Sequence, residues 1–407
     1  MHNILQFSPQ LTALEFFSGI GLARAGMAKA GIKTIWANDI DHTKCAMYSQ
    51  CWGDEHLVEQ DVHTLDPDLI PQADIAWASS PCTNLSLAGN REGLISGKES
   101  SAFFGFIKAI EGMGDRAPRA LVLENVIGLA TSNNSDDFRL VCQEFNRLGY
   151  SCDAYFIDAR HWLPQSRPRM FVVGLKNPLP NSRLDSSLRP EKVSWIHSDP
   201  SLITHVSHLN EPSPLRMTGL ATVVENIPED DKRWWNKNQV QAFIDSLAPH
   251  QAERLQRFLN AKEKIVRTAY RRTRSGVVRW EIREEEIAGC LRTARGGSSR
   301  QAVVICENGK IEVRWMTGTE YARLQGADSC QFSGFSDAQI RYAFGDAVAV
   351  PVVTWLIKNA VKPALMSSRN GVNNNGNDQL LLEPLNSGTN PSAASEAMST
   401  VTSWRLA

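Results

Sequence analysis

The sequence lacks several features that mark specialised classes of protein. Its eight cysteines include no Cys-x-x-Cys pair, which argues against a disulfide framework and against a structural zinc site. No apolar run approaches the roughly 18 residues needed to span a bilayer, and the first residues contain no basic segment followed by a long apolar one. We therefore expect a soluble, cytoplasmic protein with no membrane contact and no bound metal.

Net charge is also nearly absent. The formal charge of the 407 residues is −1, so the molecule as a whole carries no field that would attract nucleic acid. Residues 251–280 are a local exception, because nine lysines and arginines there face two acidic residues. This basic stretch is typical of a phosphate-binding surface, although a solvated helix face would have the same composition.

What the sequence does contain is the pattern of an α/β protein. Short apolar runs alternate with helical patterns from residue 12 to about residue 174, and the runs lie at 14–17, 34–37, 75–78, 121–123, 152–157 and 170–175. This alternation predicts a doubly wound, mostly parallel sheet with crossover helices. The chain length predicts one large core and a smaller inserted or appended domain.

The pattern changes after Lys176. The sequence there becomes rich in proline and serine, which predicts a domain boundary. Residues 240–266 regain helical spacing with a break at Pro249, and we expect two helices that carry the basic stretch. Beyond about residue 363 the sequence is rich in serine, asparagine and glycine, which predicts disorder.

Regular structure is expected again between the basic stretch and this tail. Asn308-Gly309 suits a left-handed turn and predicts a hairpin of strands 302–306 and 311–315. Thr317 and Glu320 have the spacing of a capping box, which predicts that a helix begins there.

A glycine-containing turn lies between the first apolar run and the first helical pattern. Residues 17–21 read Phe-Ser-Gly-Ile-Gly and lead into a helix that begins near Leu22. Glycines allow the backbone to approach a ligand closely, and a helix N-terminus attracts an anionic group. The turn therefore indicates nucleotide binding, although many strand–helix turns with two glycines bind nothing.

Carboxylates follow three of the apolar runs. Asp39 comes at the end of the second run, where an acid grips ribose hydroxyls in doubly wound folds, and Asp61 follows a short segment at 57–60. Glu124 ends the strongly apolar run 120–123, and a desolvated carboxyl there can hold or deliver a proton. Each of these acids alone also fits a helix cap or a surface loop.

Pro81-Cys82 follows the run 75–78 and places a cysteine on a loop at a strand end. A free thiol is only slightly ionised at neutral pH, so a nucleophilic cysteine needs activation. The proline stiffens the loop, and a following helix would favour the thiolate. A buried, inert cysteine is the alternative.

Gln165, Arg167 and Arg169 lead into the run 170–175, and strand alternation sends all three to one side. Two guanidinium groups on the side that also bears Cys82 and Glu124 would fix a polar ring or a phosphate. Arginine pairs at strand edges are otherwise common solubilising residues.

Taken together and in this order, these segments resemble the DNA (cytosine-5) methyltransferases. The glycine turn, Pro81-Cys82, Glu124-Asn125-Val126, Gln165-x-Arg167-x-Arg169 and a late Gly345-Asp346-Ala347-Val348 have the order and spacing of that family over about residues 12–358. The resemblance implies a class I S-adenosylmethionine-dependent methyltransferase fold, S-adenosyl-L-methionine as cofactor, and a cytosine rotated out of double-stranded DNA. It implies catalytic roles for Cys82, Glu124, Arg167 and Arg169.

The resemblance also implies how these residues act. The Cys82 thiolate attacks carbon 6 of cytosine, Glu124 bonds to ring nitrogen 3, and carbon 5 then accepts the methyl group. Arg169 contacts the cytosine carbonyl oxygen, and Arg167 supports the cysteine loop or a nearby phosphate. The implied cofactor-binding residues are Phe17, Ser18, Gly19, Ile20, Gly21, Leu22, Asp39, Ile40, Asp61, Pro81, Asp346 and Ala347. The implied DNA-binding residues are Thr83, Gln165, Arg271, Arg272, Arg274, Arg292, Arg295 and Arg300.

By the same resemblance, residues 1–177 form the catalytic and cofactor-binding domain and residues 178–290 an irregular target-recognition domain. Residues 291–363 return to the catalytic domain, and residues 364–407 form a disordered tail. We expect a monomer, with a cognate restriction endonuclease as a potential partner.

Two residues depart from the family pattern. Thr83 stands where the family usually has glutamine, which leaves open how the vacated position in the DNA is filled. Asp346 stands where asparagine is commoner, and it places an acid near the cofactor sulfonium.

Three other functions fit parts of the sequence. A catalytically silent DNA-binding relative would not need Cys82 and Glu124 together, and a transfer RNA methyltransferase would have a shorter recognition region. A nucleotide-binding oxidoreductase would use the glycine turn but not Pro81-Cys82. His205-x-x-His208 suggests a metal, but it lacks further ligands at suitable spacing and is better explained as structural.

Overall fold

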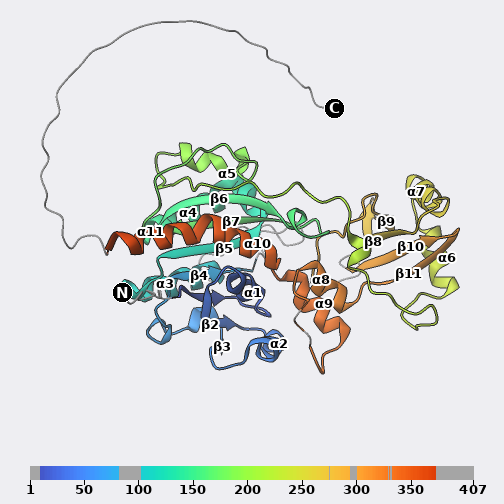
Figure 1. Cartoon of the computed structure of the whole chain (residues 1–407), viewed down its shortest axis with the longest axis horizontal. Coiled ribbons are helices and arrows are strands. Elements are labelled where there is room, and N and C mark those ends of the chain that lie inside the picture. Colours follow the sequence, from blue (N-terminus) through green and yellow to red (C-terminus); the bar gives the residue numbers. More distant parts are fainter. Residues whose placement is uncertain are drawn as a thin grey trace, which may run out of the picture. The chain divides into compact units, whose positions relative to one another are not determined.

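A seven-stranded sheet occupies the first half of the chain (Figure 1). The computed structural model describes residues 10–81, 102–274, 276–293, 300–328, 330 and 332–372. The strands are β1 Thr12–Phe16, β2 Lys33–Asp39, β3 Leu57–Glu59, β4 Ile75–Ala78, β5 Ala120–Val126, β6 Ser151–Asp158 and β7 Pro168–Leu175. Their order is β3-β2-β1-β4-β5-β7-β6; β7 runs antiparallel to both neighbours and the other pairs are parallel. The predicted doubly wound, mostly parallel sheet is confirmed.

Helices cover both faces of this sheet. They are α1 Leu22–Lys29, α2 His42–Trp52, α3 Ala102–Gly112, α4 Asp136–Arg147 and the short α5 Glu191–Ser194. Ile75 and Trp77 of β4 pack in one apolar cluster with α1, while Ala76 and Ala78 pack in a second cluster with α3 and α4. Successive side chains of a strand point to opposite faces. A strand buried on both faces therefore appears in the sequence as a continuous apolar run.

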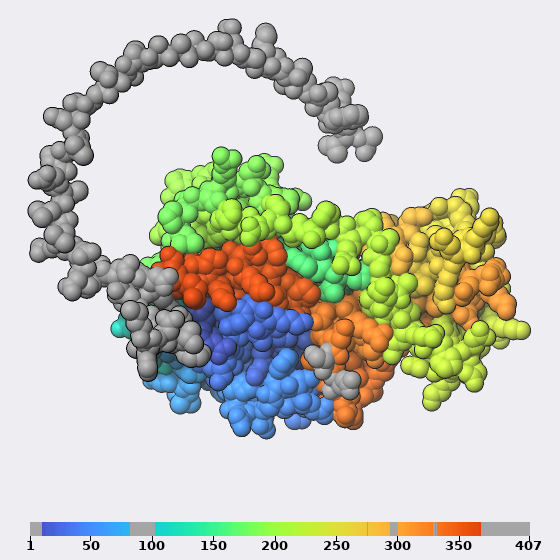
Figure 2. Space-filling view, in the orientation of Figure 1, coloured from blue at the N-terminus to red at the C-terminus, as the bar shows by residue number. Residues whose placement is uncertain are grey.

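The C-terminal helices return to the N-terminal part of the sheet. Helix α10, Val350–Leu356, packs on α1 so closely that a Cβ atom at Gly26 would overlap Val353. The Thr354 hydroxyl donates a hydrogen bond to the Gly26 carbonyl at 3.0 Å. A π-helical segment, Ile357–Val361, leads into α11, Lys362–Val372. Figure 2 shows this red C-terminal segment against the blue N-terminal one.

One helical stretch, Asp337–Ser367, is long and apolar enough to span a membrane by length and composition alone. It includes α9, Asp337–Asp346, together with α10 and part of α11. Of its most apolar window, 61% is buried inside the protein, which is the behaviour of a core helix. The predicted tail, residues 364–407, begins within α11, and residues 373–407 lie outside the described residues.

A second, antiparallel sheet has four strands in the order β11-β10-β8-β9. The strands are β8 Ile265–Arg274, β9 Val277–Ile282, β10 Gln301–Glu307 and β11 Lys310–Trp315. Helices α6, Lys237–Asp245, and α7, Pro249–Leu259, cover one face through an apolar cluster that includes Phe243 and Leu255. Asn308 and Gly309 have φ angles of 51° and 76°. The predicted hairpin and the two helices on either side of the Pro249 break are therefore confirmed.

The basic stretch does not lie on these helices as predicted. Only Arg254 and Arg257 of its nine basic residues are on α7, while the largest group, Arg267, Arg271, Arg272 and Arg274, is on β8. Residues 265–270 combine β-branched and aromatic side chains, which favour a strand. The prediction of a helical basic face was wrong because the helical spacing ends near Leu259.

The predicted capping box is confirmed. Helix α8, Gly318–Leu324, begins after Thr317, whose hydroxyl accepts from the Glu320 N–H while the Glu320 carboxylate accepts from the Thr317 N–H. Glu320 also forms a fully buried ion pair with Arg314 at 2.5 Å. These contacts fix α8 to the end of β11.

Part of the predicted recognition region packs on the large sheet. Val193 and Ile196 belong to the apolar cluster beneath α4, and Thr204 forms a parallel bridge with Cys152 of β6. The irregular residues that follow β7 therefore extend the core of the large sheet before the chain reaches α6.

Candidate active site

A carboxylate and a guanidinium meet at the carboxyl end of β5. Glu124 lies two residues before the end of that strand, and Arg169 lies opposite Val126 on the neighbouring β7. The Arg169 Nε atom is 3.1 Å from Glu124 Oε1, and the two side chains are 15% and 7% exposed. Low exposure reduces the screening by water and strengthens the interaction. The structure thus brings together two of the four residues that the sequence predicts to be catalytic.

Asn125 connects this pair to the loop that follows β4. Its Nδ2 atom donates to the Ser80 carbonyl at 3.3 Å, and its Oδ1 atom accepts from the Val126 N–H. Ser80 precedes the exposed Pro81. Cys82 and Thr83 follow this proline and lie outside the described residues. The sequence analysis gave Asn125 no role; the available signal was a second polar residue at the end of an apolar strand.

Arg167 is buried, with 1% of its surface exposed. Its guanidinium donates to the carbonyls of Leu291 at 2.9 Å, Gly345 at 3.3 Å and Ala347 at 2.6 Å. Burial lowers the pKa of this guanidinium, with a further contribution from Arg169. A side chain so enclosed is not available to a DNA phosphate, so that part of the predicted role is wrong. Its contacts instead join β7 to the segment that contains Asp346.

Gln165 is completely buried. Its amide donates to the Leu324 carbonyl at 2.6 Å, and its Oε1 atom accepts from the Leu291 N–H at 3.3 Å. The predicted DNA contact of Gln165 is therefore wrong, because both of its polar ends bond to the protein backbone. A glutamine beside two arginines suggested a binding surface, whereas the backbone groups that satisfy it come from more than 120 positions later in the chain.

Cys290 lies beside both arginines. Its sulfur is 3.4 Å from Arg167 and 3.7 Å from Arg169. Burial opposes ionisation, but the charges of Arg169 and Arg167 outweigh it and lower the pKa of the Cys290 thiol. The sequence analysis gave this cysteine no role, since its charged neighbours are distant in the chain.

The glycine turn has the backbone shape that its sequence predicts. Phe17, Gly19 and Gly21 have φ angles of 55°, 54° and 79°, and Gly21 is the N-cap of α1, just before Leu22. The Ile20 carbonyl accepts a hydrogen bond from Trp52 at 3.0 Å. A Cβ atom at Gly21 would overlap the indole of Trp52. Only glycine fits there, because both the φ angle and the space exclude a side chain.

Polar and apolar groups surround this turn in a way that suits a nucleoside. The Ser18 hydroxyl is buried and has no hydrogen-bond partner among the described residues. Asp39 accepts from the Gly19 N–H at 2.7 Å, and burial raises the pKa of Asp39. Ile40 follows with 66% of its surface exposed, which is unusual for a large apolar side chain. Asp61 is exposed after β3 and caps a short helical turn through the His63 N–H.

Asp346 forms an ion pair beside the same turn. Its carboxylate is 2.7 Å from Lys44 Nζ, and the side chains of lysine and aspartate are 13% and 47% exposed. Burial opposes the positive charge, but Asp346 outweighs this effect and raises the pKa of Lys44. The lysine stem lies next to Gly19. Lys44, which the sequence analysis missed, therefore balances the acid that departs from the family pattern.

Glu15, at the end of β1, is a buried carboxyl with an unusual pKa. Its Oε1 atom accepts from the Arg24 N–H at 2.9 Å, while Oε2 has no partner among the described residues. Burial raises the pKa of Glu15 to about 8. Between about pH 5 and about pH 8 the folded protein holds a proton that the unfolded chain releases. The free energy of unfolding therefore falls as pH rises through this window.

We expect Glu15→Gln to flatten this pH dependence, because glutamine keeps the acceptor for Arg24 but has no proton to lose. The wild type should lose on the order of a few kcal/mol of stability across the window relative to the variant. Denaturant unfolding at a series of pH values measures the difference. Glu229→Gln, at an exposed position, is the control and should follow the wild type. A Glu15→Gln profile parallel to that of the wild type would contradict the assignment.

The arginines predicted to bind DNA differ in their surroundings. Arg272 and Arg274 are exposed and share Glu281, at 3.9 Å and 2.6 Å, so their positive charge is partly balanced. Arg271 lies over the ring of Trp280 and Arg300 over the ring of Trp315. Arg292 is exposed, and its backbone packs on Gly345. Arg295 lies outside the described residues.

His205 belongs to a buried polar network. Its Nδ1 atom is 3.1 Å from the Ser151 hydroxyl, and burial lowers the pKa of His205 to about 4. Nearby, Arg189 binds both oxygens of Asp153 at 3.0 Å and 2.7 Å. His208 is exposed and 3.5 Å from Ser182. Among the described residues no three His, Cys, Asp or Glu side chains form a group that could hold a metal ion.

Known proteins resemble this chain over most of its length. A family model described as C-5 cytosine-specific DNA methylase matches residues 11–362. The type II methyltransferase M.HaeII of Haemophilus aegyptius is 25% identical over 357 residues, which are 88% of this chain and 94% of that protein. M.Bsp6I of Bacillus sp. strain RFL6 is 22% identical over 87% of this chain and 100% of its own length. M.NgoFVII of Neisseria gonorrhoeae reaches 30% identity over 43% of this chain and 46% of its own.

Solved structures share the fold. The Schizosaccharomyces pombe Dnmt2 methyltransferase superposes with a TM-score of 0.56 at 15% identity and covers 87% of this chain and 99% of its own. The Entamoeba histolytica methyltransferase EhMeth has a TM-score of 0.55 at 13% identity, with 89% and 99% covered. At such low identity these likenesses concern the fold alone.

Proposed function

We propose, from the premise that this chain belongs to the C-5 cytosine-specific DNA methylase family, that it methylates carbon 5 of a cytosine rotated out of double-stranded DNA. The observation that supports this reaction is the ion pair of Glu124 and Arg169 at the end of β5. Asn125 connects that strand end to Ser80, two residues before Cys82. An acid and a guanidinium thus lie beside the strand end that precedes the predicted nucleophile in the sequence.

The chemistry follows from what the pyrimidine lacks, since carbon 5 of cytosine is too weak a nucleophile to take a methyl group directly. In the proposed reaction the Cys82 thiolate adds to carbon 6, and Glu124 bonds to or protonates ring nitrogen 3, so that the ring becomes an enamine. Arg169 orients the ring at its carbonyl oxygen. After methylation, which leaves S-adenosyl-L-homocysteine, the carbon 5 proton passes to water and its bonding electrons re-form the double bond to carbon 6. This expels the Cys82 thiolate, Glu124 takes back any proton it gave to ring nitrogen 3, and 5-methylcytosine remains.

S-adenosyl-L-methionine supplies the electrophilic methyl group in this proposal. The methionine end would lie beside the glycine turn, where the unpartnered Ser18 hydroxyl would offer it a hydrogen bond. Asp39 would bind ribose, Asp61 the adenine amino group, and Phe17 with the exposed Ile40 the two faces of adenine. The exposure of the apolar Ile40 side chain supports this arrangement, because an adenine ring could cover that side chain.

Arg167 is a positioning residue in this proposal. It holds the carbonyls of residues 345 and 347, and so it fixes the approach of Asp346 to Lys44. We propose that this network keeps the cofactor side and the cytosine side of the site in register.

The Lys44–Asp346 pair leads to a specific expectation for cofactor binding. Asp346→Asn should weaken binding of S-adenosyl-L-methionine, because it removes a negative charge near the sulfonium and leaves Lys44 uncompensated. The dissociation constant should rise up to about fivefold, as for other partly exposed charge pairs. S-adenosyl-L-homocysteine, whose sulfur is neutral, should be affected less. Calorimetric titration with both compounds measures the difference.

The double variant Lys44→Gln/Asp346→Asn is the matched control. It removes both charges of the pair, and it should bind S-adenosyl-L-methionine more tightly than Asp346→Asn alone. Equal losses for the two cofactor forms, or no recovery in the double variant, would contradict an electrostatic role for the pair.

We also propose that residues 178–290 recognise the target sequence and that Arg271, Arg272, Arg274, Arg292 and Arg300 contact DNA. Glu281 already pairs with two of these arginines, which reduces their expected contribution to binding.

Bisulfite sequencing of DNA from a host that expresses the chain tests the proposed function. New 5-methylcytosine within a fixed sequence context is the expected result, and it reports the activity, the base and the target together. A radiolabelled methyl-transfer assay offers mixed-sequence duplex DNA and transfer RNA in parallel. Methylation of RNA alone, or of neither substrate, would overturn the proposal.

A further inference from the structure

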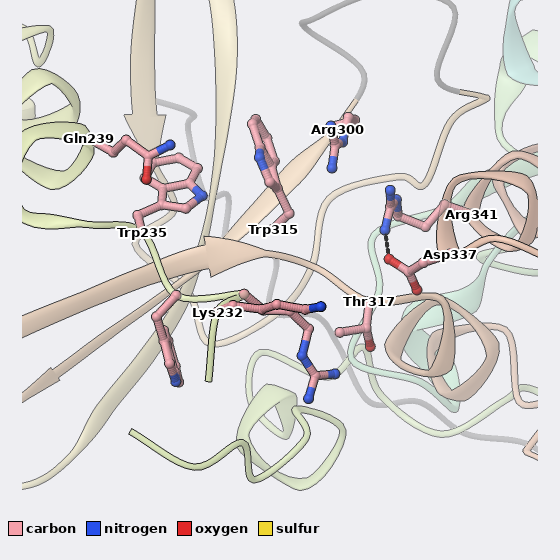
Figure 3. A pocket seen from close by; sticks show the side chains of 10 residues that line it. Lys232, Trp235, Gln239, Arg300, Trp315, Thr317, Asp337 and Arg341 are labelled. Carbon is pink, nitrogen blue, oxygen red and sulfur yellow. Dashed lines mark hydrogen bonds and ion pairs between the residues drawn. The ribbon is translucent and has the colours of Figure 1, made fainter. Parts of the chain in front are cut away.

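A cationic pocket lies where the small sheet meets helices α8 and α9 (Figure 3). Its volume is about 290 Å³. Charged residues at its wall are Lys232, Arg233, Arg300, Arg341 and Asp337, and Trp235 and Trp315 contribute aromatic rings. The described wall thus has four positive side chains and one negative one.

Two of these positive charges have no balancing acid among the residues that the structure describes. Arg233 pairs with Asp231, and Arg341 pairs with Asp337. Neither Lys232 nor Arg300 forms an ion pair with any residue that the structure describes. The wall therefore keeps an excess of positive charge, on the exposed Lys232 and the partly buried Arg300.

Arg341 supplies a second, independent sign of a binding site. The side chain is only 7% exposed, and its Nε atom has no hydrogen-bond partner among the described residues. The Nε atom of Arg300 is also buried, and it too has no hydrogen-bond partner among the residues that the structure describes. Burial, followed by the charge of Arg300, lowers the pKa of the Arg341 guanidinium. In Figure 3 both guanidinium groups point into the same space.

The tryptophans favour an anion over a nucleobase. Arg300 lies over the ring of Trp315 at 4.2 Å, and Trp235 packs against the same indole with its centroid at 5.1 Å. The face of Trp315 that Arg300 covers is therefore not free to stack on a base. The cation–π contact instead holds the Arg300 guanidinium in one orientation, with donors left for the oxygens of a phosphate.

We propose that this pocket binds one backbone phosphate of the DNA substrate. The inference rests on the proposed action on DNA, whose phosphodiesters are the anions that such an enzyme must meet. The volume is at the lower end for a ligand pocket and suits a single phosphate group with its adjoining sugar atoms. This cationic pocket, called the Arg300–Arg341 pocket below, would fix the position of the duplex without reading its sequence.

Arg300→Gln in the full chain tests the proposal. The affinity for a fluorescent duplex of mixed sequence is measured by anisotropy over a series of salt concentrations. Loss of one phosphate contact should make the slope of log K against log salt less steep by about 0.9. Lys232→Gln, at an exposed position, tests the same wall with little risk to folding and should change the slope in the same direction.

Lys310→Gln is the matched control, because it removes one charge from the opposite end of the same hairpin. It should keep the wild-type slope. A wild-type slope for Arg300→Gln and Lys232→Gln would overturn the phosphate assignment. Inorganic phosphate is a second probe: if it raises the melting temperature of the wild type but not of Arg300→Gln while the DNA slopes stay equal, the pocket binds a free anion and the DNA assignment is wrong.

Failure of this inference is distinguishable from failure of the proposed function. If the wild type methylates DNA and Arg300→Gln keeps its salt slope, only the pocket assignment falls. If the wild type neither binds nor methylates duplex DNA, the proposed function falls and the inference falls with it.

Discussion

Replacement of Cys82 by alanine is expected to reduce methyl transfer to the background of the assay. Without the thiolate, carbon 5 of the pyrimidine is never activated, so no other residue compensates. Binding of S-adenosyl-L-methionine should persist, because the glycine turn, Asp39 and Lys44 come from other segments. Radiolabelled transfer to DNA measures the first effect, and calorimetric titration of the cofactor measures the second.

Duplexes that contain 5-fluorocytosine separate the nucleophile from other thiols. The fluorine replaces the proton that must leave carbon 5, so the enzyme should stay bound covalently in the presence of the methyl donor. Cys82→Ala should form no such adduct. Cys290→Ala should still form it, although Arg169 and Arg167 lower the pKa of Cys290. An adduct that is lost in Cys290→Ala but kept in Cys82→Ala would assign the nucleophile to Cys290.

Glu124→Gln is expected to slow methyl transfer by roughly 10²- to 10⁴-fold, the usual contribution of a positioned acid or base. Glutamine is nearly isosteric and can still accept from Arg169, which now lies 3.1 Å from the carboxylate. It carries no negative charge and no acidic proton for ring nitrogen 3. Single-turnover kinetics with saturating cofactor measures the chemical step apart from product release.

Glu144→Gln is the matched control for this experiment. Glu144 also forms an ion pair with an arginine, at 2.9 Å from Arg147, but it lies on α4. Its variant should keep the wild-type rate. If Glu124→Gln reacted as fast as Glu144→Gln, ring nitrogen 3 would have to be stabilised by another group.

The sequence predicted the large sheet well because its central strands β1, β4 and β5 are buried almost throughout. Residues 75–78 and 120–123 are apolar without interruption. Such runs can be recognised as strands from the sequence without knowing which strands they pair with. The capping box at Thr317 and the turn at Asn308-Gly309 were also local signals. In these cases the residues that determine the structure lie within a few positions of each other.

Features that depend on distant contacts were missed or misread. Gln165 was taken for a DNA contact because the Leu324 and Leu291 backbone groups that satisfy it lie far along the chain. Lys44 and Asp346 form their pair across 302 positions, and neither residue indicates the other by spacing. The Arg300–Arg341 pocket was missed for the same reason, since its wall combines four separate segments. The local periodicity of a sequence contains no information on contacts between residues that are distant in the chain.

The close packing of α10 on α1 has a consequence for biosynthesis. Leu22, Ala23 and Met27 of α1 are buried in the finished protein, and part of their cover comes from a helix that begins at Val350. A chain that emerges from the ribosome in order must therefore expose this apolar stripe until the residues from Val350 onward have been made. Contacts between such distant segments slow folding and leave surface open to aggregation. Premature termination before residue 350 should accordingly yield insoluble product rather than a smaller functional enzyme.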